Sequence, residues 1–164
     1  MLEQIQKEYG NKVRHIYKDF PLGGQIQSEP AAVAARCAAK SGKFWEYHDE
    51  LYKNQGSLGP DLFGQLADRL SLPKDDWKKC TQDNQTRESV KKDQGEGISL
   101  GVTGTPTFFI NGKKVVGALP FEKFKQVIDE ELKKKQKAVV AGFKPATTTI
   151  SPLQYSPQPM DQQA

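Results

Sequence analysis

Residues 107–116, with the sequence TFFINGKKVV, constrain the fold of this chain more than any other segment. Two short runs rich in aromatic and β-branched residues flank the dipeptide Asn111-Gly112. Asparagine and glycine adopt the positive φ angles of a type I′ turn at little cost, and this turn joins adjacent antiparallel strands. The segment therefore predicts a β-hairpin. A final helix is predicted after it, with one apolar face formed by Phe121, Phe124, Val127, Ile128 and Leu132.

Residues 28–101 have an almost entirely helical pattern. Ser28 is a suitable N-cap, Pro30 suits an early helical position, and the alanine-rich run that follows has high helix propensity as far as Ser41-Gly42. Glycine and proline punctuate the rest of the block. The further helices are predicted at residues 44–54, 61–70, 73–80 and 84–100, with Gly101 closing the last.

The amino-terminal part predicts a helix followed by a strand. Apolar residues recur with helical spacing at Leu2, Ile5 and Tyr9, and Gly10-Asn11 ends this pattern. Side chains then alternate over residues 13–18, which indicates a short strand before Phe20-Pro21. The predicted order is helix, strand, helical block, hairpin and helix, which is an α/β arrangement.

Charge and composition exclude several classes of function. The net charge is +4, but five of the 24 basic and one of the 20 acidic residues lie beyond residue 132, which leaves 19 of each sign before it. Nucleic-acid surfaces need clustered basic residues, so no nucleic-acid partner is expected. No stretch approaches the roughly 20 apolar residues of a membrane span. Residues 136–164, rich in Pro, Thr, Ser and Gln, are predicted to be disordered.

Three segments carry a resemblance to a known family. They are KDFPL at residues 18–22, AARCAAKSGKFWEYHDELY at 34–52 and GVTGTPTFFINGKKVVGALP at 101–120. Together they resemble the DsbA-like thioredoxin_4 group of thiol-disulfide oxidoreductases, in the order and spacing of that group over about residues 1–133. The resemblance implies a thioredoxin-like α/β fold, formed by residues 1–27 and 102–135 and interrupted by a helical insertion at 28–101.

The resemblance also implies what this sequence lacks. The family has a first strand and a C-x-x-C pair at the start of the first helix, ahead of the stretch that begins here at Met1. The cysteines of this chain, Cys37 and Cys80, do not form such a motif, so no catalytic residue and no cofactor are assigned. There is no signal-peptide pattern, and the helical spacing at the start suggests that the sequence begins inside an element. A misplaced start codon, a broken assembly or a deliberate fragment would each account for this.

Thr105-Pro106 is the substrate-binding element that the resemblance implies. In thioredoxin folds the corresponding X-Pro bond is cis and lies beside the redox cysteines, where the backbone of the preceding residue pairs with a bound peptide. Without the resemblance, an X-Pro bond has only about a 5% chance of being cis. A proline that merely begins an edge strand is the alternative.

Cys37 and Cys80 have three interpretations. By resemblance to family members with a second, structural disulfide, the two residues are expected to form a bridge between insertion helices. The alternative is a pair of buried free thiols. A metal site with His48 or His15 has less support, because neither C-x2-4-C nor H-x3-5-H spacing occurs.

The aromatic residues of segment 44–52 also allow two interpretations. Trp45, Tyr47, His48 and Tyr52 could form a ligand cage. However, Phe44, His48, Leu51 and Tyr52 share one helical face, which favours packing in the core. His48 is therefore expected to be a structural histidine.

The family resemblance implies an extracytoplasmic thiol-disulfide oxidoreductase that acts on unfolded or reduced proteins with a redox partner. A non-catalytic peptide-binding remnant of the same fold is the alternative, and a glutathione-transferase-like relative is a third. Loss of an inner strand removes two hydrogen-bond ladders, so we expect a partly unfolded monomer with protection confined to residues 28–101. A second chain, or residues 146–150 of the tail, would be the replacement strand otherwise.

Overall fold

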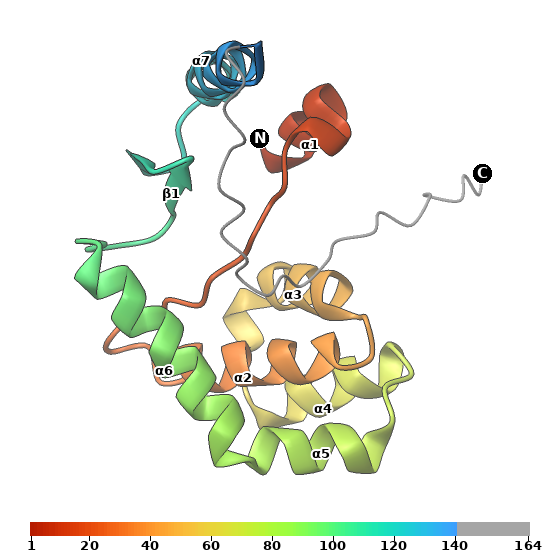
Figure 1. Ribbon diagram of the computed structural model, residues 1–164. Coiled ribbons are helices and arrows are strands. Elements are labelled where there is room, and N and C mark those ends of the chain that lie inside the picture. The colour runs from red at the N-terminus through yellow and green to blue at the C-terminus, as the bar shows by residue number, and fades with distance from the viewer. Residues whose placement is uncertain (141–164) are drawn as a thin grey trace. The chain divides into compact units, whose positions relative to one another are not determined.

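The computed structural model describes residues 1–140, with residues 135–140 as backbone only. The described chain forms two compact units. One, which we call the helical unit, contains residues 17–101, and the other, the hairpin unit, contains residues 1–16 and 102–140. Figure 1 shows the helices of the first unit in orange to green, and the helices and strands of the second in red and in green to blue.

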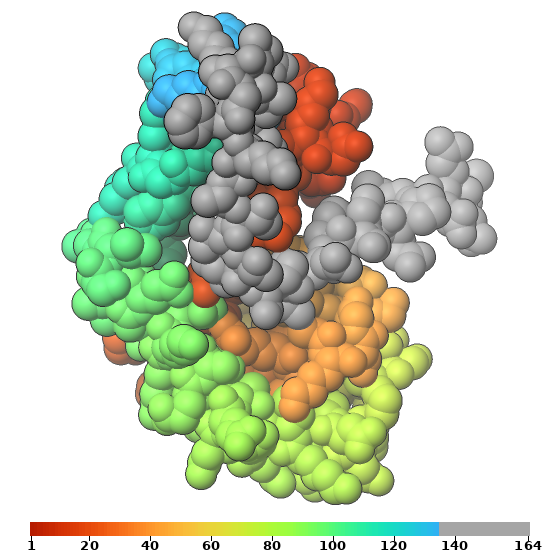
Figure 2. All heavy atoms as spheres, viewed as in Figure 1, coloured from red at the N-terminus to blue at the C-terminus, as the bar shows by residue number. Residues whose placement is uncertain are grey.

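Helix α2 (Ser28–Ala39) is the centre of the helical unit. It contacts each of the other α-helices of this unit (Figure 1). Small alanine side chains allow this close approach, and Ala34 and Ala38 are almost completely buried. Figure 2 shows the helical unit as the orange to green part of the surface. The other elements of the unit are α3 (Phe44–Lys53), the 3-10 turn η2 (Gln55–Ser57), α4 (Pro60–Arg69), α5 (Lys74–Gln82) and α6 (Asn84–Ser99).

The helix bounds agree with the sequence pattern to within two residues, but two details differ. Ser28 is the first residue of α2 and Gln27 is its N-cap, so the predicted capping role of Ser28 is wrong. The Ser28 hydroxyl instead accepts a hydrogen bond from the Leu22 N–H at 3.3 Å. The buried face of α3 is also shifted, because Tyr47 is fully buried whereas Tyr52 is 56% exposed.

The hairpin unit contains α1 (Leu2–Tyr9), the 3-10 turn η1 (Gly10–Lys12), the strands β1 (Thr107–Ile110) and β2 (Lys113–Val116), and α7 (Phe121–Val140). The strands pair antiparallel, with Ile110 opposite Lys113. Asn111 and Gly112 both have positive φ, 48° and 88°, as a type I′ turn requires. The predicted hairpin is confirmed. The core of the hairpin unit contains Ile5, Tyr9, Phe124 and Ile128, and Phe108, Ile110 and Val115 of the strands pack against them.

Residues 13–18 do not form the predicted strand. Val13 is extended, with φ −125° and ψ 129°, and exposure alternates along residues 13–18 as it does in a strand. The sheet of the described residues nevertheless contains β1 and β2 alone, so the segment has no ladder partner there. Alternating side chains reveal an extended backbone, but a strand also requires a neighbour to which its N–H and C=O groups can bond.

The carboxyl-terminal boundary differs slightly from the prediction. Helix α7 continues to Val140, beyond the predicted limit at residue 135. The rest of the predicted tail, which includes the candidate strand at residues 146–150, lies outside the described residues. In the described part of the chain, no helix has both the length and the apolar composition to cross a membrane.

Candidate functional site

The Thr105-Pro106 bond is cis, as the family resemblance implies. Both residues are exposed, and they lie immediately before β1. The N–H of Gly117 donates to the Pro106 carbonyl at 2.8 Å, and the Thr107 hydroxyl donates to the Gly104 carbonyl at 2.7 Å. The Thr105 backbone forms no hydrogen bond with another described residue. It is therefore available to an external partner.

The free edge of β1 continues from this exposed dipeptide. Hydrogen-bonded and non-bonded residue pairs alternate along an antiparallel ladder. Since Gly117 bonds to Pro106, the pairs Phe108–Val115 and Ile110–Lys113 are the hydrogen-bonded ones. Thr107 and Phe109 consequently direct their backbone N–H and C=O groups away from β2. Among the described residues no strand lies on that side, so β1 presents an open edge.

Packing on one face of β1 fixes the position of this edge. The Phe108 ring meets the Phe124 ring of α7 edge to face, with centroids 4.8 Å apart. Ile110 packs in the same core, whereas Phe109, on the opposite face, is 41% exposed. A strand anchored through one face and free at one edge can accept an extended peptide without rearranging.

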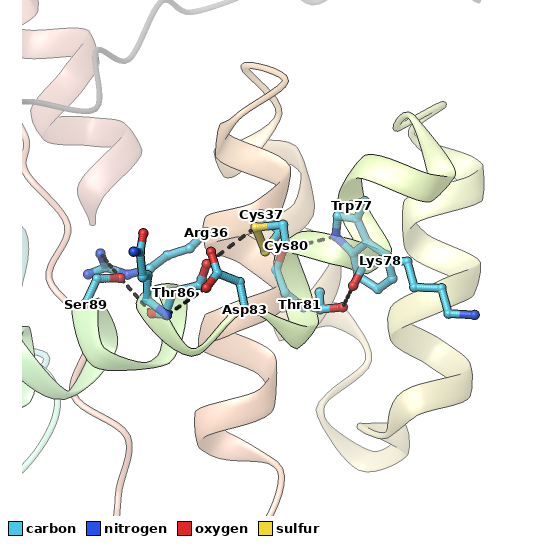
Figure 3. The surroundings of a disulfide bond; sticks show 11 residues. Arg36, Cys37, Trp77, Lys78, Cys80, Thr81, Asp83, Thr86 and Ser89 are labelled. Atoms are coloured by element: carbon cyan, nitrogen blue, oxygen red, sulfur yellow. Dashed lines mark hydrogen bonds between the residues drawn. A yellow bond between two sulfur atoms is a disulfide. The ribbon is translucent and has the colours of Figure 1, made fainter.

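Cys37 and Cys80 form a disulfide between α2 and α5, as the family resemblance implies. Their Cα atoms are 5.7 Å apart, within the range that a disulfide spans. Both residues are buried, and Figure 3 shows Cys80 facing Thr86 at the start of α6, with a separation of 3.6 Å between sulfur and hydroxyl oxygen. The chain has no other cysteine, so it presents no free thiol.

An ionic network that the sequence interpretation missed lies beside the disulfide. The Arg36 guanidinium bonds to the carboxylates of Asp19 and Asp93 and donates to the Ser89 hydroxyl at 3.1 Å. The Lys18 ammonium donates to Asp93 and Glu96, both at 2.9 Å. Asp19 and Asp93 are buried. We call Lys18, Asp19, Arg36, Asp93 and Glu96 the ionic network.

Burial raises the pKa of Asp19, and the opposing influence of Arg36 is smaller. Among the groups that lower this pKa, and so favour the charged carboxylate, Arg36 has the largest influence. The sequence KDFPL gives one indication that Asp19 is buried, because this aspartate stands between a β-rich run and Phe20-Pro21. Nothing in the sequence, however, identifies partners 17 and 57 positions from Arg36.

Three of the four residues of the alternative ligand cage, Trp45, His48 and Tyr52, belong to an aromatic cluster. His48 lies 5.0 Å from the Tyr17 ring and 4.7 Å from the Tyr52 ring, measured between centroids, and its Nδ1 is 2.9 Å from an Asp49 oxygen. Burial raises the pKa of Tyr17, with a smaller contribution from Tyr52. Tyr47 lies apart, in the core, where its hydroxyl donates to the Phe63 carbonyl at 2.7 Å. The rings of the cluster pack edge to face or tilted against one another.

A metal site has little support from the geometry. His48 contacts aromatic rings and Asp49, and both sulfurs are committed to the disulfide. Within residues 1–134, no group of three or more His, Cys, Asp or Glu side chains is arranged to hold a metal ion.

Comparisons with known proteins agree with this architecture. A family model described as Thioredoxin, of the Thioredoxin_4 group, matches residues 1–130. The crystal structure of Wolbachia pipientis alpha-DsbA1 superposes with a TM-score of 0.70 and 23% sequence identity, covering 86% of this chain and 78% of that one. At that identity the likeness establishes the fold, which confirms the predicted thioredoxin-like α/β class.

Two curated relatives add sequence similarity. The probable disulfide bond formation protein D of Bacillus cereus is 32% identical over 146 residues, which are 82% of this chain and 66% of that protein. The Na(+)/H(+) antiporter NhaA 1 of Salinispora arenicola is 36% identical over 112 residues, 67% of this chain but 17% of the antiporter. This chain thus spans only part of each. From the match over residues 1–130, the chain belongs to the DsbA-like, thioredoxin-fold Thioredoxin_4 family.

Proposed function

We propose that this chain supplies the peptide-facing part of a thiol-disulfide oxidoreductase that forms or exchanges disulfides in reduced or unfolded proteins. The observation that carries the proposal is the open edge of β1, which runs from the exposed Thr105-Pro106 to Phe109. An extended peptide would bond to the outward N–H and C=O groups as an added strand. Such pairing recognises the main chain of the substrate, which all proteins share. It therefore suits an enzyme family that acts on many proteins.

The proposal gives Cys37 and Cys80 no part in the oxidation of substrate. They are 43 positions apart, bonded to each other and buried. Redox catalysis in this family uses a C-x-x-C pair whose thiolate is exposed at a helix start. The chemistry would therefore come from a dithiol other than this pair, renewed by a redox partner. A buried disulfide also supports an oxidising, extracytoplasmic setting.

Paired proline substitutions on the hairpin test the peptide edge. Thr107→Pro removes an outward N–H of β1, and Val116→Pro removes the outward N–H of β2 at the same rung of the ladder. We expect Thr107→Pro to weaken binding of a fluorescent, extended peptide about tenfold, since one strand hydrogen bond and its neighbours are lost. The control Val116→Pro should leave the affinity unchanged.

A second pair of measurements separates backbone pairing from other effects. Thr107→Val retains the N–H and loses the hydroxyl bond to Gly104, so it should bind like the original chain. A peptide that is N-methylated at alternate amides should bind poorly to every variant. Equal loss of affinity in the Thr107→Pro and Val116→Pro chains would contradict a site at the β1 edge.

The second candidate is a peptide-binding or interaction protein without redox chemistry. It is favoured by the absence of a C-x-x-C motif from the 164 residues. We expect this chain to oxidise a dithiol peptide no faster than the variant with Cys37→Ser and Cys80→Ser, since a vicinal pair is needed to resolve the mixed disulfide. Activity that disappears in the variant would assign the redox step to Cys37 and Cys80, against both candidates as stated.

A further inference from the structure

Helix α5 has little apolar surface of its own. Its sequence, KDDWKKCTQ, places Cys80 alone among the buried residues, with Trp77 half-buried. The lysines and aspartates of this helix are exposed. A nine-residue helix is marginal in water without tertiary contacts. Its persistence in the fold therefore depends on a few attachments.

The non-covalent attachments of α5 depend mainly on Trp77. Its indole N–H donates to the Ala34 carbonyl of α2 at 3.3 Å, and its ring lies 6.3 Å from that of Tyr47, measured between centroids. The ion pair between Lys74 and Asp68, 3.9 Å apart, involves side chains that are 78% and 62% exposed. Such exposed pairs contribute little. The covalent attachment is the bond from Cys80 to Cys37 on α2.

The main core of the helical unit receives only the half-buried Trp77 from α5. Its buried members come from α2, α3 and α4 and from Leu72, which precedes α5. On the other side, Arg36 of α2 bonds to Ser89 and Asp93 of α6. Thr86 and Val90 of α6 are buried against the disulfide itself. Both ends of the α5 segment therefore have attachments besides the disulfide.

We propose that the Cys37–Cys80 disulfide is a redox latch for α5, whose reduction releases residues 74–82 from α2 while the remaining helices stay folded. Because both cysteines are buried, at 3% and 5% exposure, a reductant reaches the sulfur atoms only when α5 lifts away. Trp77 therefore controls access to the bond.

The reductant is a small or protein dithiol. One of its thiolates attacks a sulfur of the pair, forms a mixed disulfide and displaces the other sulfur as a thiolate. Its second thiol, once deprotonated, attacks the mixed disulfide and frees the remaining cysteine. The dithiol ends as a disulfide, two electrons pass to the chain, and Cys37 and Cys80 take up the two protons that the dithiol lost.

Hydrogen exchange of the full chain, oxidised and then reduced with dithiothreitol, tests the latch. We expect amides in residues 74–82 to exchange at least about tenfold faster after reduction. Amides of α3 and α4 should change less than about threefold. Loss of protection across α2 to α6 would show that the bond holds the whole unit together, and unchanged exchange in residues 74–82 would show that Trp77 suffices. Either result would overturn the proposal.

Two matched tryptophan substitutions test the control of access. Trp77→Phe removes the bond to Ala34, so the disulfide should be reduced about fivefold faster by dithiothreitol. Trp45→Phe, on α3 and away from the disulfide, should leave the rate unchanged. Equal rates for both variants and the original chain would show that the sulfurs are attacked without detachment of α5.

Discussion

Replacing Arg36 with leucine is expected to lower the free energy of unfolding of the helical unit by about 3–5 kcal/mol. The guanidinium is shared by two buried carboxylates, Asp19 and Asp93, and also donates to Ser89. Leucine fills much of the volume but leaves both negative charges without their partner. Chemical denaturation followed by circular dichroism measures the loss, since this unit is almost entirely helical.

Two variants separate charge burial from the loss of an ordinary ion pair. Arg69→Leu also breaks an arginine–carboxylate pair, with Glu50 at 2.9 Å, but the Arg69 side chain is 58% exposed. It should cost less than about 1 kcal/mol. Asparagine at both positions 19 and 93 should recover most of the stability lost in the Arg36→Leu chain. Equal effects of the Arg36 and Arg69 substitutions would contradict a buried network.

The stability of the Arg36→Leu variant is expected to depend on pH through the charge of Asp19. Burial already raises the folded pKa of Asp19 above its ordinary value of 3.8, and Arg36 opposes this shift. Without Arg36 the pKa rises further. Between 3.8 and the raised value, the folded state binds more protons than the unfolded state, so stability increases as the pH falls. The titratable and charged groups that interact with Asp19 are Arg36, Asp93, His48 and Tyr17.

We therefore expect the destabilisation caused by Arg36→Leu to shrink on acidification from neutral pH toward 3.8, the ordinary pKa of the aspartate. Denaturation curves for the variant and the original chain at each pH give this difference directly. A difference that grows as the pH falls would mean that Asp19 stays charged in the variant and that the assigned cause of its pKa shift is wrong.

Amides of the helical unit are expected to exchange with solvent at least about 100-fold more slowly than amides of β1 and β2. The helical unit has an extensive core, with Ala38, Tyr47 and Leu66 fully buried, and a disulfide. The sheet of the described residues consists of two four-residue strands. An isolated hairpin of this size is at best marginally stable in water. Hydrogen exchange with mass spectrometry measures both regions in one sample.

Matched core truncations test whether the two units open separately. Leu66→Ala and Phe124→Ala each remove a side chain that is at most 1% exposed, one from each unit. Such truncations cost about 2–5 kcal/mol. The first should accelerate exchange in α2 to α4 alone, and the second in β1, β2 and α7 alone. If each variant accelerates exchange in both units, or if strands and helices are equally protected, the units form one cooperative structure.

Local chemistry made the hairpin and the helices predictable. Asn111-Gly112 has few alternatives to a type I′ turn between apolar runs, and glycine or proline marks several of the helix ends. The Cys37–Cys80 bridge and the cis bond at Pro106 were predictable only through the family resemblance, because nothing local specifies either.

The errors arose where distant residues decide the outcome. Residues 13–18 alternate as a strand does, but pairing depends on a neighbouring strand that the local pattern does not reveal. Helical spacing alone placed Tyr52 on the core face and left Tyr47 out of it. The packing of α3 against α2 and α4 instead buries Tyr47 and exposes Tyr52. The ionic network was missed because charged residues in a helical sequence are usually solvated.

The contacts of Lys18 have a consequence for how a helical block of this kind can be accommodated in a host protein. Its ammonium lies 2.9 Å from Glu96, and the Pro21 carbonyl accepts a hydrogen bond from Gln94 at 2.6 Å. The chain therefore enters the helical unit beside the same helix, α6, by which it leaves. A block whose two ends are held together occupies the place of a short surface loop, so it adds little closure entropy to the protein that contains it. Evolution, or a protein engineer, can then lengthen, exchange or graft such a cassette without separating the two ends at which it joins its host.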